Sequence, residues 1–352
     1  MYPRLLIDTK KYAHNIKVMK QLCDDNHVTI MAVTKVYCAE QPLVDVVNDS
    51  GVDYIADSRL INLKNMDTSL PKVLLRIPSI HEADEVVRHA SISLNSEIAT
   101  ITALDKAARQ NKQSHDIILM IDIGDLREGI FYKENIVNAV REIQHLSHIN
   151  LIGMGTNLTC YGGIIPNEKT LTKLIDIIDL IHQMLGIDFQ IISGGNSSHI
   201  HLLQKHQNLP KVNNVRLGES LILGRETAYG HAIDNMHQDV VLLQVDLIEV
   251  KAKPSIPEGD IGMNAFGQTP SFQDYGLMKR GILAIGKQDV DYHELIPLDN
   301  QIRLVGSSSD HIIVDLTHTD KNYEIGDVIT FKLSYGSLLS LMTSKYVEKK
   351  YV

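Results

Sequence analysis

The stretch VTIMAVTKVYC at residues 28–38 is an apolar run without polar alternation, and it ends in a lysine, Lys35. Strands that are covered on both faces have this pattern, and they belong mostly to parallel sheets. Similar runs recur along the first two thirds of the chain, which gives eight predicted strands in all. These are residues 28–36, 52–57, 73–77, 91–95, 117–124, 149–156, 189–194 and 214–223.

Amphipathic segments separate these strands. Apolar residues recur at helical spacing in residues 12–23, 98–108, 135–146 and 171–185. Strands that alternate with helices predict an α/β fold, and eight such units predict a (β/α)8 TIM barrel over residues 9–232. A doubly wound open sheet has a similar alternation, but the number of strands favours the barrel.

The pattern changes after residue 232. No long helix is expected before the last twenty residues, and turns with Gly, Pro and Asp separate several short apolar runs. These runs, at residues 239–252, 280–286, 302–306, 311–317 and 327–333, predict strands. We therefore expect a C-terminal β domain over residues 233–352. The opening strand, within residues 1–8, is assigned to this domain rather than to the barrel.

Composition excludes several classes of protein. The 352 residues are 44% hydrophobic, which is enough for a large core, and the net charge of −9 argues against binding to nucleic acid. Cys23, Cys38 and Cys160 fit neither a zinc signature nor a disulfide framework. No apolar run is long enough to span a membrane, and the N-terminal segment lacks a long apolar stretch. We expect a cytoplasmic protein that binds no metal, nucleic acid or membrane.

Polar residues at the ends of the predicted strands mark the site, because barrels place their active sites there. Burial of Lys35 at a strand end would lower the pKa of its amine and suit it to Schiff-base chemistry; a lysine that reaches out to water is the alternative. The turn SGGNSS at residues 193–198 suits phosphate, or it is a flexible turn with a serine cap. Arg216 could pair with a ring nitrogen, a phosphate or a surface carboxylate.

Motifs along nearly the whole chain resemble those of the fold-type III enzymes that depend on pyridoxal 5'-phosphate (PLP). The resemblance is to the alanine/ornithine racemase family, and within it most of all to the ornithine racemases. It implies a racemase that interconverts L- and D-amino acids by removing the Cα proton, in a homodimer whose barrel mouths are covered by the partner's β domain. The motifs are PRLLID, VTKVYC, DYIADSR, LLRIP, SLNSE, MIDIGDLREGI, TNLTCYGG, SGGNSS, VRLGESLILGRET, NAFGQTP, AIGKQDV, GSSSDH and MTSKYV.

The resemblance also implies roles for individual residues. Lys35 holds the cofactor covalently and acts as one acid/base, while Arg127 touches the cofactor's phenolate oxygen. Arg216 faces the pyridine nitrogen and disfavours its protonation, whereas decarboxylases of this fold type have a carboxylate there. Asn157 occupies the place of a histidine that packs on the ring. The phosphate would be held by Ser197, Gly218, Glu219 (through its backbone N–H) and Tyr351.

The chain departs from alanine racemases at three places. Phe266 stands where the partner subunit of those enzymes supplies a catalytic tyrosine. The lysine that is often carbamylated is absent near Met120, and Ala39 stands where a tyrosine follows the cofactor lysine, with Tyr37 nearby. The chain is therefore not expected to be a standard alanine racemase.

Two aspartates indicate the substrate. Asp289 and Asp310 lie where the partner's β domain lines the pocket in relatives, and carboxylates there suit a distal ammonium such as that of ornithine. Each aspartate could equally be a turn residue. Asp310 and His311 are the first candidates for the second acid/base, ahead of Cys160 and Tyr161. A structural His311 with a water relay is as compatible with the sequence.

Three other functions remain open at this stage. One is another fold-type III reaction, such as that of an alanine racemase, a D-amino-acid lyase or a decarboxylase, of which Arg216 argues against the last. A PLP carrier or homeostasis protein would resemble the barrel alone and leave the β domain unexplained. A barrel that binds sugar phosphates without PLP would leave Lys35 unexplained.

Overall fold

A computed structural model describes the whole chain, residues 1–352. It consists of two compact units, Thr9–Gln238 and a unit formed by Met1–Asp8 together with Asp239–Val352. The sequence pattern suggested a boundary at residue 232, whereas here it follows Gln238. Residues up to 238 stay with the barrel because the Asn15 side chain bonds both backbone groups of His237, accepting from its N–H at 2.7 Å and donating to its carbonyl at 2.8 Å.

The unit Thr9–Gln238 is a closed parallel barrel. Its strands follow the order β2–β3–β4–β5–β6–β8–β9–β10, and β10 pairs with β2 to complete the circle. The predicted (β/α)8 barrel is thus confirmed. The barrel strands are β2 (Thr29–Val33), β3 (Tyr54–Asp57), β4 (Lys72–Leu74), β5 (Ile92–Asn95), β6 (His115–Asp122), β8 (Ile149–Gly155), β9 (Ile191–Ser193) and β10 (Asn214–Leu217). The two-residue strand β7 (Ile130–Phe131) extends the sheet from β6.

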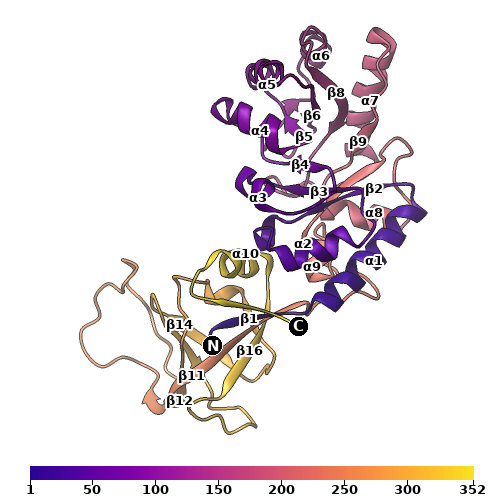
Figure 1. The fold of residues 1–352 in the computed structure, drawn as a ribbon. Helices are drawn as coiled ribbons and strands as arrows, with labels where there is room; N and C mark the ends of the chain where they lie inside the picture. The colour runs from indigo at the N-terminus through magenta and orange to yellow at the C-terminus, as the bar shows by residue number, and fades with distance from the viewer. The chain divides into compact units, whose positions relative to one another are not determined.

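Helices surround the barrel on its outer side (Figure 1). They are α1 (Thr9–Asp25), α2 (Gln41–Asn48), α3 (Leu60–Asn65), α4 (Ala83–His89), α5 (Ile98–Gln110), α6 (Ile136–Gln144), α7 (Glu168–Leu185), α8 (Ile200–Gln204) and α9 (Glu219–Leu223). Short 3-10 turns are η1 (Lys35–Tyr37), η2 (Ile80–Glu82) and η3 (Ser197–His199). Apolar side chains from β2 to β6 and from β9 form one buried cluster with Met31, Ile118 and Ile191 among its members.

Several predicted strands are shorter than the sequence suggested, and the difference is largest for the first and the eighth. The first ends at Val33, because Thr34 begins the turn η1. The eighth ends at Leu217, and its predicted second half is helix α9. The chain turns at Gly218, where a Cβ atom would lie only 3.1 Å from the Cβ of Val33. This close approach joins the ends of two neighbouring strands that are far apart in the sequence, so the periodicity of apolar residues cannot predict it.

The second unit is an antiparallel β domain, as predicted. Its strands follow the order β13–β16–β11–β12–β15–β14, and β1 pairs with both β11 and β17. The bounds are β1 (Arg4–Ile7), β11 (Val241–Pro254), β12 (Leu277–Leu283), β13 (Leu295–Pro297), β14 (Arg303–Ser307), β15 (Ile312–Asp315), β16 (Val328–Leu333) and β17 (Glu348–Tyr351), with α10 (Tyr335–Thr343) and the turn η4 (Tyr292–Glu294). The sequence pattern missed β13 and β17. None of the helices in the chain is long and apolar enough to cross a membrane.

A buried histidine lies in the barrel wall. His115 begins β6 and is 2% exposed, and its Nε2 lies 2.8 Å from the hydroxyl of Ser93 in β5. Burial lowers the pKa of His115 to about 4. The imidazole is therefore neutral in the folded protein at neutral pH, and folding excludes its charged form.

We predict that the protein loses stability in mild acid because of this residue. An unfolded histidine titrates near 6.5, so between pH 6.5 and about 4 the unfolded chain binds a proton that the folded chain does not. The contribution is complete above pH 6.5 and is lost as the pH falls toward 4, up to about 3 kcal/mol. In urea unfolding at several pH values, His115→Gln should flatten this loss, whereas the exposed His145→Gln should not. Equal pH dependence in His115→Gln and wild type would contradict the prediction.

Candidate active site

Lys35 lies at the carboxyl end of β2, at the start of the turn η1. A buried carboxylate on the neighbouring strand anchors this turn: the Thr34 hydroxyl donates to Asp57 Oδ2 at 2.5 Å. Burial raises the pKa of Asp57, while hydrogen bonds from Thr34 and Arg59 N and the charge of Lys35 oppose that rise. The Lys35 side chain is half-buried, so it is more exposed than its apolar run suggested.

Two tyrosines support the Lys35 turn. The hydroxyls of Tyr37 and of Tyr12 in α1 lie 3.1 Å apart, and both side chains are about 1% exposed. Burial raises the pKa of both phenols, so both are neutral. After Tyr37 the chain passes through positive φ angles at Cys38 (53°) and Ala39 (52°). These two residues, both in the left-handed region, end the turn and lead the chain into α2.

Arg216 is a buried cation in β10. Its guanidinium is held by neutral acceptors, the Ser193 hydroxyl at 2.6 Å and the Thr156 carbonyl at 2.7 Å, and the side chain is 5% exposed. Burial lowers the pKa of Arg216 to about 10, which leaves it charged at neutral pH. A buried guanidinium that is bonded only to neutral acceptors favours an electron-rich ligand, such as a ring nitrogen.

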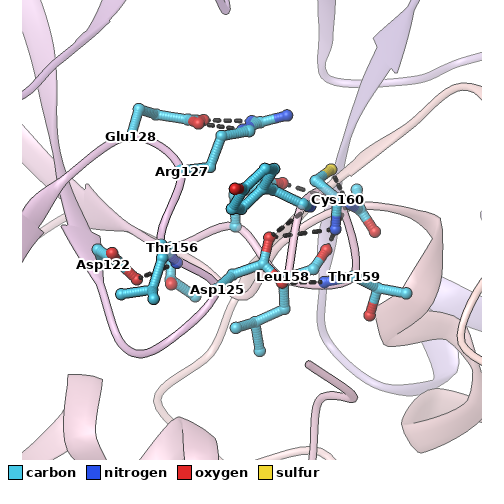
Figure 2. Close-up of polar contacts among 12 residues, drawn as sticks. Asp122, Asp125, Arg127, Glu128, Thr156, Leu158, Thr159 and Cys160 are labelled. Atoms are coloured by element: carbon cyan, nitrogen blue, oxygen red, sulfur yellow. Dashed lines mark hydrogen bonds and ion pairs between the residues drawn. The ribbon is translucent and has the colours of Figure 1, made fainter. Parts of the chain in front are cut away.

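Arg127 and Asn157 lie beside Arg216. Arg127 lies in the loop after β6. Desolvation lowers the pKa of its guanidinium, but the ion pair with Glu128 and other nearby negative groups outweigh this and raise the pKa (Figure 2). The amide oxygen of Asn157 accepts from Arg216 Nη2 at 3.3 Å, and in the flipped amide orientation it accepts from Arg127 Nη2 at 2.5 Å. The structure therefore brings these three predicted residues together into a cationic group at the barrel mouth.

Two turns form an adjoining polar cradle. Arg216 N donates to Gly195 O at 2.8 Å, and the Ser197 hydroxyl accepts from Ser220 N at 3.1 Å in the first turn of α9. The turns at residues 195–198 and 218–220 therefore lie against each other. The first N–H groups of a helix have no intrahelical acceptor, and the buried Ser198 hydroxyl has no partner in the protein. The Glu219 side chain pairs with Arg225 at 2.8 Å, so only its backbone can serve this cradle.

These observations fit PLP. The cradle supplies N–H and hydroxyl donors for a phosphate, and the three-residue cationic group supplies donors for the polar atoms of a ring. Lys35 supplies an amine at the end of the strand next to Arg216, because β2 and β10 pair directly. No group of three or more His, Cys, Asp or Glu side chains in the structure could hold a metal ion.

Cys160 and Tyr161 lie in the barrel loop after β8, and the other predicted residues lie in the β domain. The turns at residues 286–289 and 308–311 are bonded together, because Lys287 N donates to Ser308 O at 2.9 Å. The Lys287 ammonium lies 4.3 Å from the ring centre of Phe266, so Phe266 belongs to the same group. This group thus contains Asp289, Asp310 and His311. Tyr351 ends β17, opposite Ile7 of β1.

Asp310 differs from what the sequence suggested. A carboxyl that carries a proton at neutral pH would need a pKa raised by burial, but Asp310 is exposed, and the hydroxyl of Ser309 holds the pKa of its carboxyl below the usual value. It is therefore an ionised group, suited to binding a cation rather than to carrying a proton. His311 Nδ1 lies 3.1 Å from the Asp310 carboxylate, and the half-buried ring lines a shallow hollow with Ile248 and Ile282. Asp289 accepts from the Ser344 hydroxyl at 2.5 Å.

The sequence pattern did not single out two residues of the site. Ser193, the last residue of β9, bonds Arg216, and its only signal was its place at the start of SGGNSS. Asp125 is 1% exposed in the loop that carries Arg127, and its carboxylate accepts backbone N–H groups from the loop after β8. Its bonding partners are more than thirty residues away in the sequence, so no local motif marks it.

A closed parallel barrel with a lysine just after its first strand, followed by an antiparallel domain, is the fold of the alanine racemases. The solved alanine racemase of Clostridium difficile 630 superposes with a TM-score of 0.75 at 17% identity, over 99% of this chain and 95% of that chain. The alanine racemase of Bartonella henselae, solved with covalently bound pyridoxal phosphate, has a TM-score of 0.75 at 15% identity and 99% coverage of both chains. These likenesses confirm the predicted fold class.

Sequence similarity identifies the family. The alanine racemase N-terminal domain matches residues 7–226. The ornithine racemase of Acetoanaerobium sticklandii is 45% identical over 351 residues, 99% of each chain. The lysine racemase of Thermotoga maritima is 36% identical over 354 residues, which cover 100% of this chain and 99% of the relative. The chain belongs to the alanine racemase family, and the predicted class, an isomerase that racemises amino acids with PLP, is confirmed.

Proposed function

We propose that this protein is a PLP-dependent racemase of basic amino acids whose preferred substrate is ornithine. One observation carries the proposal: the buried Arg216, beside Arg127 and Asn157, lies in the barrel of a chain that is 45% identical to an ornithine racemase. Bound PLP stabilises negative charge at the substrate Cα, which makes the Cα proton removable. The residues of this chain then have to hold the reactants and move the proton.

Each predicted residue has a role in this proposal. Lys35 binds the cofactor covalently and exchanges the Cα proton on one face. Arg216 would donate to the ring nitrogen and so leave it unprotonated, Arg127 would contact the phenolate oxygen, and Asn157 would pack on the ring in the place of a histidine. The phosphate is held by Ser197, Gly218, Glu219 and Tyr351.

His311 is the proposed second acid/base. Phe266 has no proton to transfer, and Asp310 is exposed and ionised, so the imidazole is the group of this cluster that can both donate and accept. The Asp310 carboxylate, 3.1 Å from His311 Nδ1, fixes the ring and favours a proton on that nitrogen. Two groups on opposite faces of Cα each reach their own proton position, which is a simpler geometry for racemisation in both directions than a single base that reaches both faces.

The acidic residues of the β domain support a substrate with a distal ammonium. Asp310 is ionised, and Asp289 lies in the turn bonded to it. The two relatives are named after ornithine and lysine, and both of these amino acids carry such an ammonium. A charge-assisted hydrogen bond to it adds both energy and selectivity over alanine.

We also propose a homodimer in which the partner's β domain covers each barrel mouth. The irregular segment 255–276, between β11 and β12, exposes apolar side chains, including Met263 at 78% and Phe272 at 43%. Exposed apolar surface of this kind marks contacts with protein, and a second copy of the chain is the partner we propose. With a net charge of −9, we propose no nucleic-acid partner, and we propose the cytoplasm as its location.

Lys35→Ala should remove the near-visible absorbance of the purified protein and essentially all turnover, because no other amine can hold the cofactor at this place. The control is Lys64→Ala, which removes a lysine that pairs with Glu85 on the protein surface. A Lys35→Ala protein with the absorbance and turnover of wild type would refute the assignment.

A chiral assay over a panel of amino acids should give ornithine a kcat/KM roughly a hundredfold or more above that of alanine, because alanine has no distal ammonium to pair with the aspartate carboxylates. Asp310→Asn should narrow this difference by lowering the value for ornithine alone. Equal efficiencies on alanine and ornithine would rule out the proposed preference.

Subunit mixing tests the dimer and His311 together. Lys35→Ala keeps an intact β domain, and His311→Asn keeps an intact barrel, so each variant alone should be inactive. If sites are shared between subunits, half of the randomly mixed dimers contain one complete site, and about a quarter of the wild-type rate should return. No recovery after mixing, with exchange of subunits verified by mass spectrometry, would mean that the site is not shared in this way.

A further inference from the structure

We propose that Asp125 is a positioning residue of the active site: its buried carboxylate fixes the loop after β8, residues 157–164, against the loop that carries Arg127. The inference rests on the proposed function, because it assigns a further residue to the same site. Asp125 does not touch the cofactor-binding groups themselves. It acts through the backbone of the loop that begins with Asn157.

Both oxygens of the Asp125 carboxylate accept hydrogen bonds. Its side chain is 1% exposed, and both oxygens accept two backbone N–H groups each (Figure 2). The donors to Oδ1 are Thr159 N and Ile164 N, both at 3.1 Å, and those to Oδ2 are Cys160 N at 3.2 Å and Tyr161 N at 3.0 Å. In addition, the Asp125 carbonyl accepts from Gly162 N at 3.1 Å.

This bonding gives the loop one arrangement. A carboxylate this deeply buried needs its charge compensated, and the four N–H groups converge on it only if the loop keeps its curled path. The loop has no regular secondary structure, so its backbone N–H groups have no carbonyl acceptors in a helix or sheet and depend on the carboxylate. The carboxylate and the loop therefore depend on each other.

The loop places groups that face the cofactor site. It begins at Asn157, which bonds Arg216 and in the flipped orientation Arg127, and Arg127 follows Asp125 by two residues. The Asn196 side chain also holds the loop, donating to Leu158 O at 2.8 Å and contacting Cys160 Sγ at 3.2 Å. Asp125 thus sets the separation of Arg127 and Asn157, and a misplacement of about 1 Å at such groups can cost roughly a hundredfold in rate.

A matched pair of substitutions separates this role from a general effect of charge. Asp125→Asn replaces Oδ2 or Oδ1 by an NH2 group, which then opposes two N–H donors, whichever way the amide is turned. Asp122, the last residue of β6, uses only Oδ1, accepting from Gly124 N at 2.8 Å and Leu126 N at 3.2 Å. Asp122→Asn therefore removes the same charge but can keep its hydrogen bonds.

The experiment measures amide hydrogen exchange and steady-state kinetics on the purified, cofactor-loaded proteins. Asp125→Asn should exchange the amides of residues 159–164 at least tenfold faster and lower kcat for ornithine at least tenfold, while the near-visible absorbance is retained. Asp122→Asn should stay within about twofold of wild type in both. Exchange in the barrel strands should be unchanged in both variants, which excludes general unfolding.

A second variant keeps the test valid if Asp125→Asn folds poorly. A Cβ atom at Gly162 would lie 2.8 Å from the Asp125 carbonyl oxygen, so Gly162→Ala disturbs the same junction from the exposed side of the loop. It should show the same faster exchange and the same direction of change in kcat.

Wild-type exchange in Asp125→Asn and Gly162→Ala, or fast exchange with wild-type kcat, would overturn the role of Asp125. An equal loss of kcat in Asp122→Asn would also overturn it, because charge alone would then account for the effect. Failure of the proposed function has a different signature: the wild-type protein itself would racemise no basic amino acid, while the exchange data would still report on the loop.

Discussion

The parallel pairing of β10 with β2 is the constraint on which the site depends. Its register sets Arg216 opposite Met31, a member of the buried barrel cluster, and so directs the guanidinium toward the barrel interior. The same pairing brings Gly218 against Val33, at the end of the strand that leads to Lys35. Barrel closure thus joins the first and last strands and places the cofactor lysine beside the phosphate cradle, although some 180 residues separate them in the sequence.

Several charged side chains are buried around this site, and each of them forms hydrogen bonds with backbone groups. Asp57 accepts from Arg59 N, Arg216 donates to Thr156 O, and Asp125 accepts from four backbone groups. Glu226, which is 1% exposed, likewise accepts from Ala228 N and His231 N in the loop after α9. Leaving a buried charge unpaired costs several kcal/mol, so each of these residues restricts its loop to few conformations. The mouth of the barrel is therefore rigid where it must hold a planar ring.

Much of this arrangement follows from the sequence. Uninterrupted apolar runs predicted the barrel strands, and their ends predicted where Lys35, Arg127 and Arg216 would lie. The turn at Gly218 was not predictable, because it depends on contact with Val33 nearly two hundred residues earlier. Asp125 was missed for a similar reason, since its bonding partners belong to another βα loop. The exposure of Asp310 was not predictable either, because periodicity does not reveal that its turn is exposed or that the neighbouring serine hydroxyls stabilise the charge of its carboxyl.

The place of β1 has a consequence for how the chain is made. This strand lies in sequence before the whole barrel, yet its partners are β11 and β17, from Val241–Pro254 and Glu348–Tyr351. During synthesis on the ribosome, the barrel segments emerge and can close while β1 has nothing to pair with. The apolar side chains of Leu5 and Ile7, both fully buried in the finished domain, remain in solution at least until β11 has left the exit tunnel, and β1 gains its second partner only when β17 follows. For that interval the nascent chain carries an unpaired strand with exposed apolar side chains.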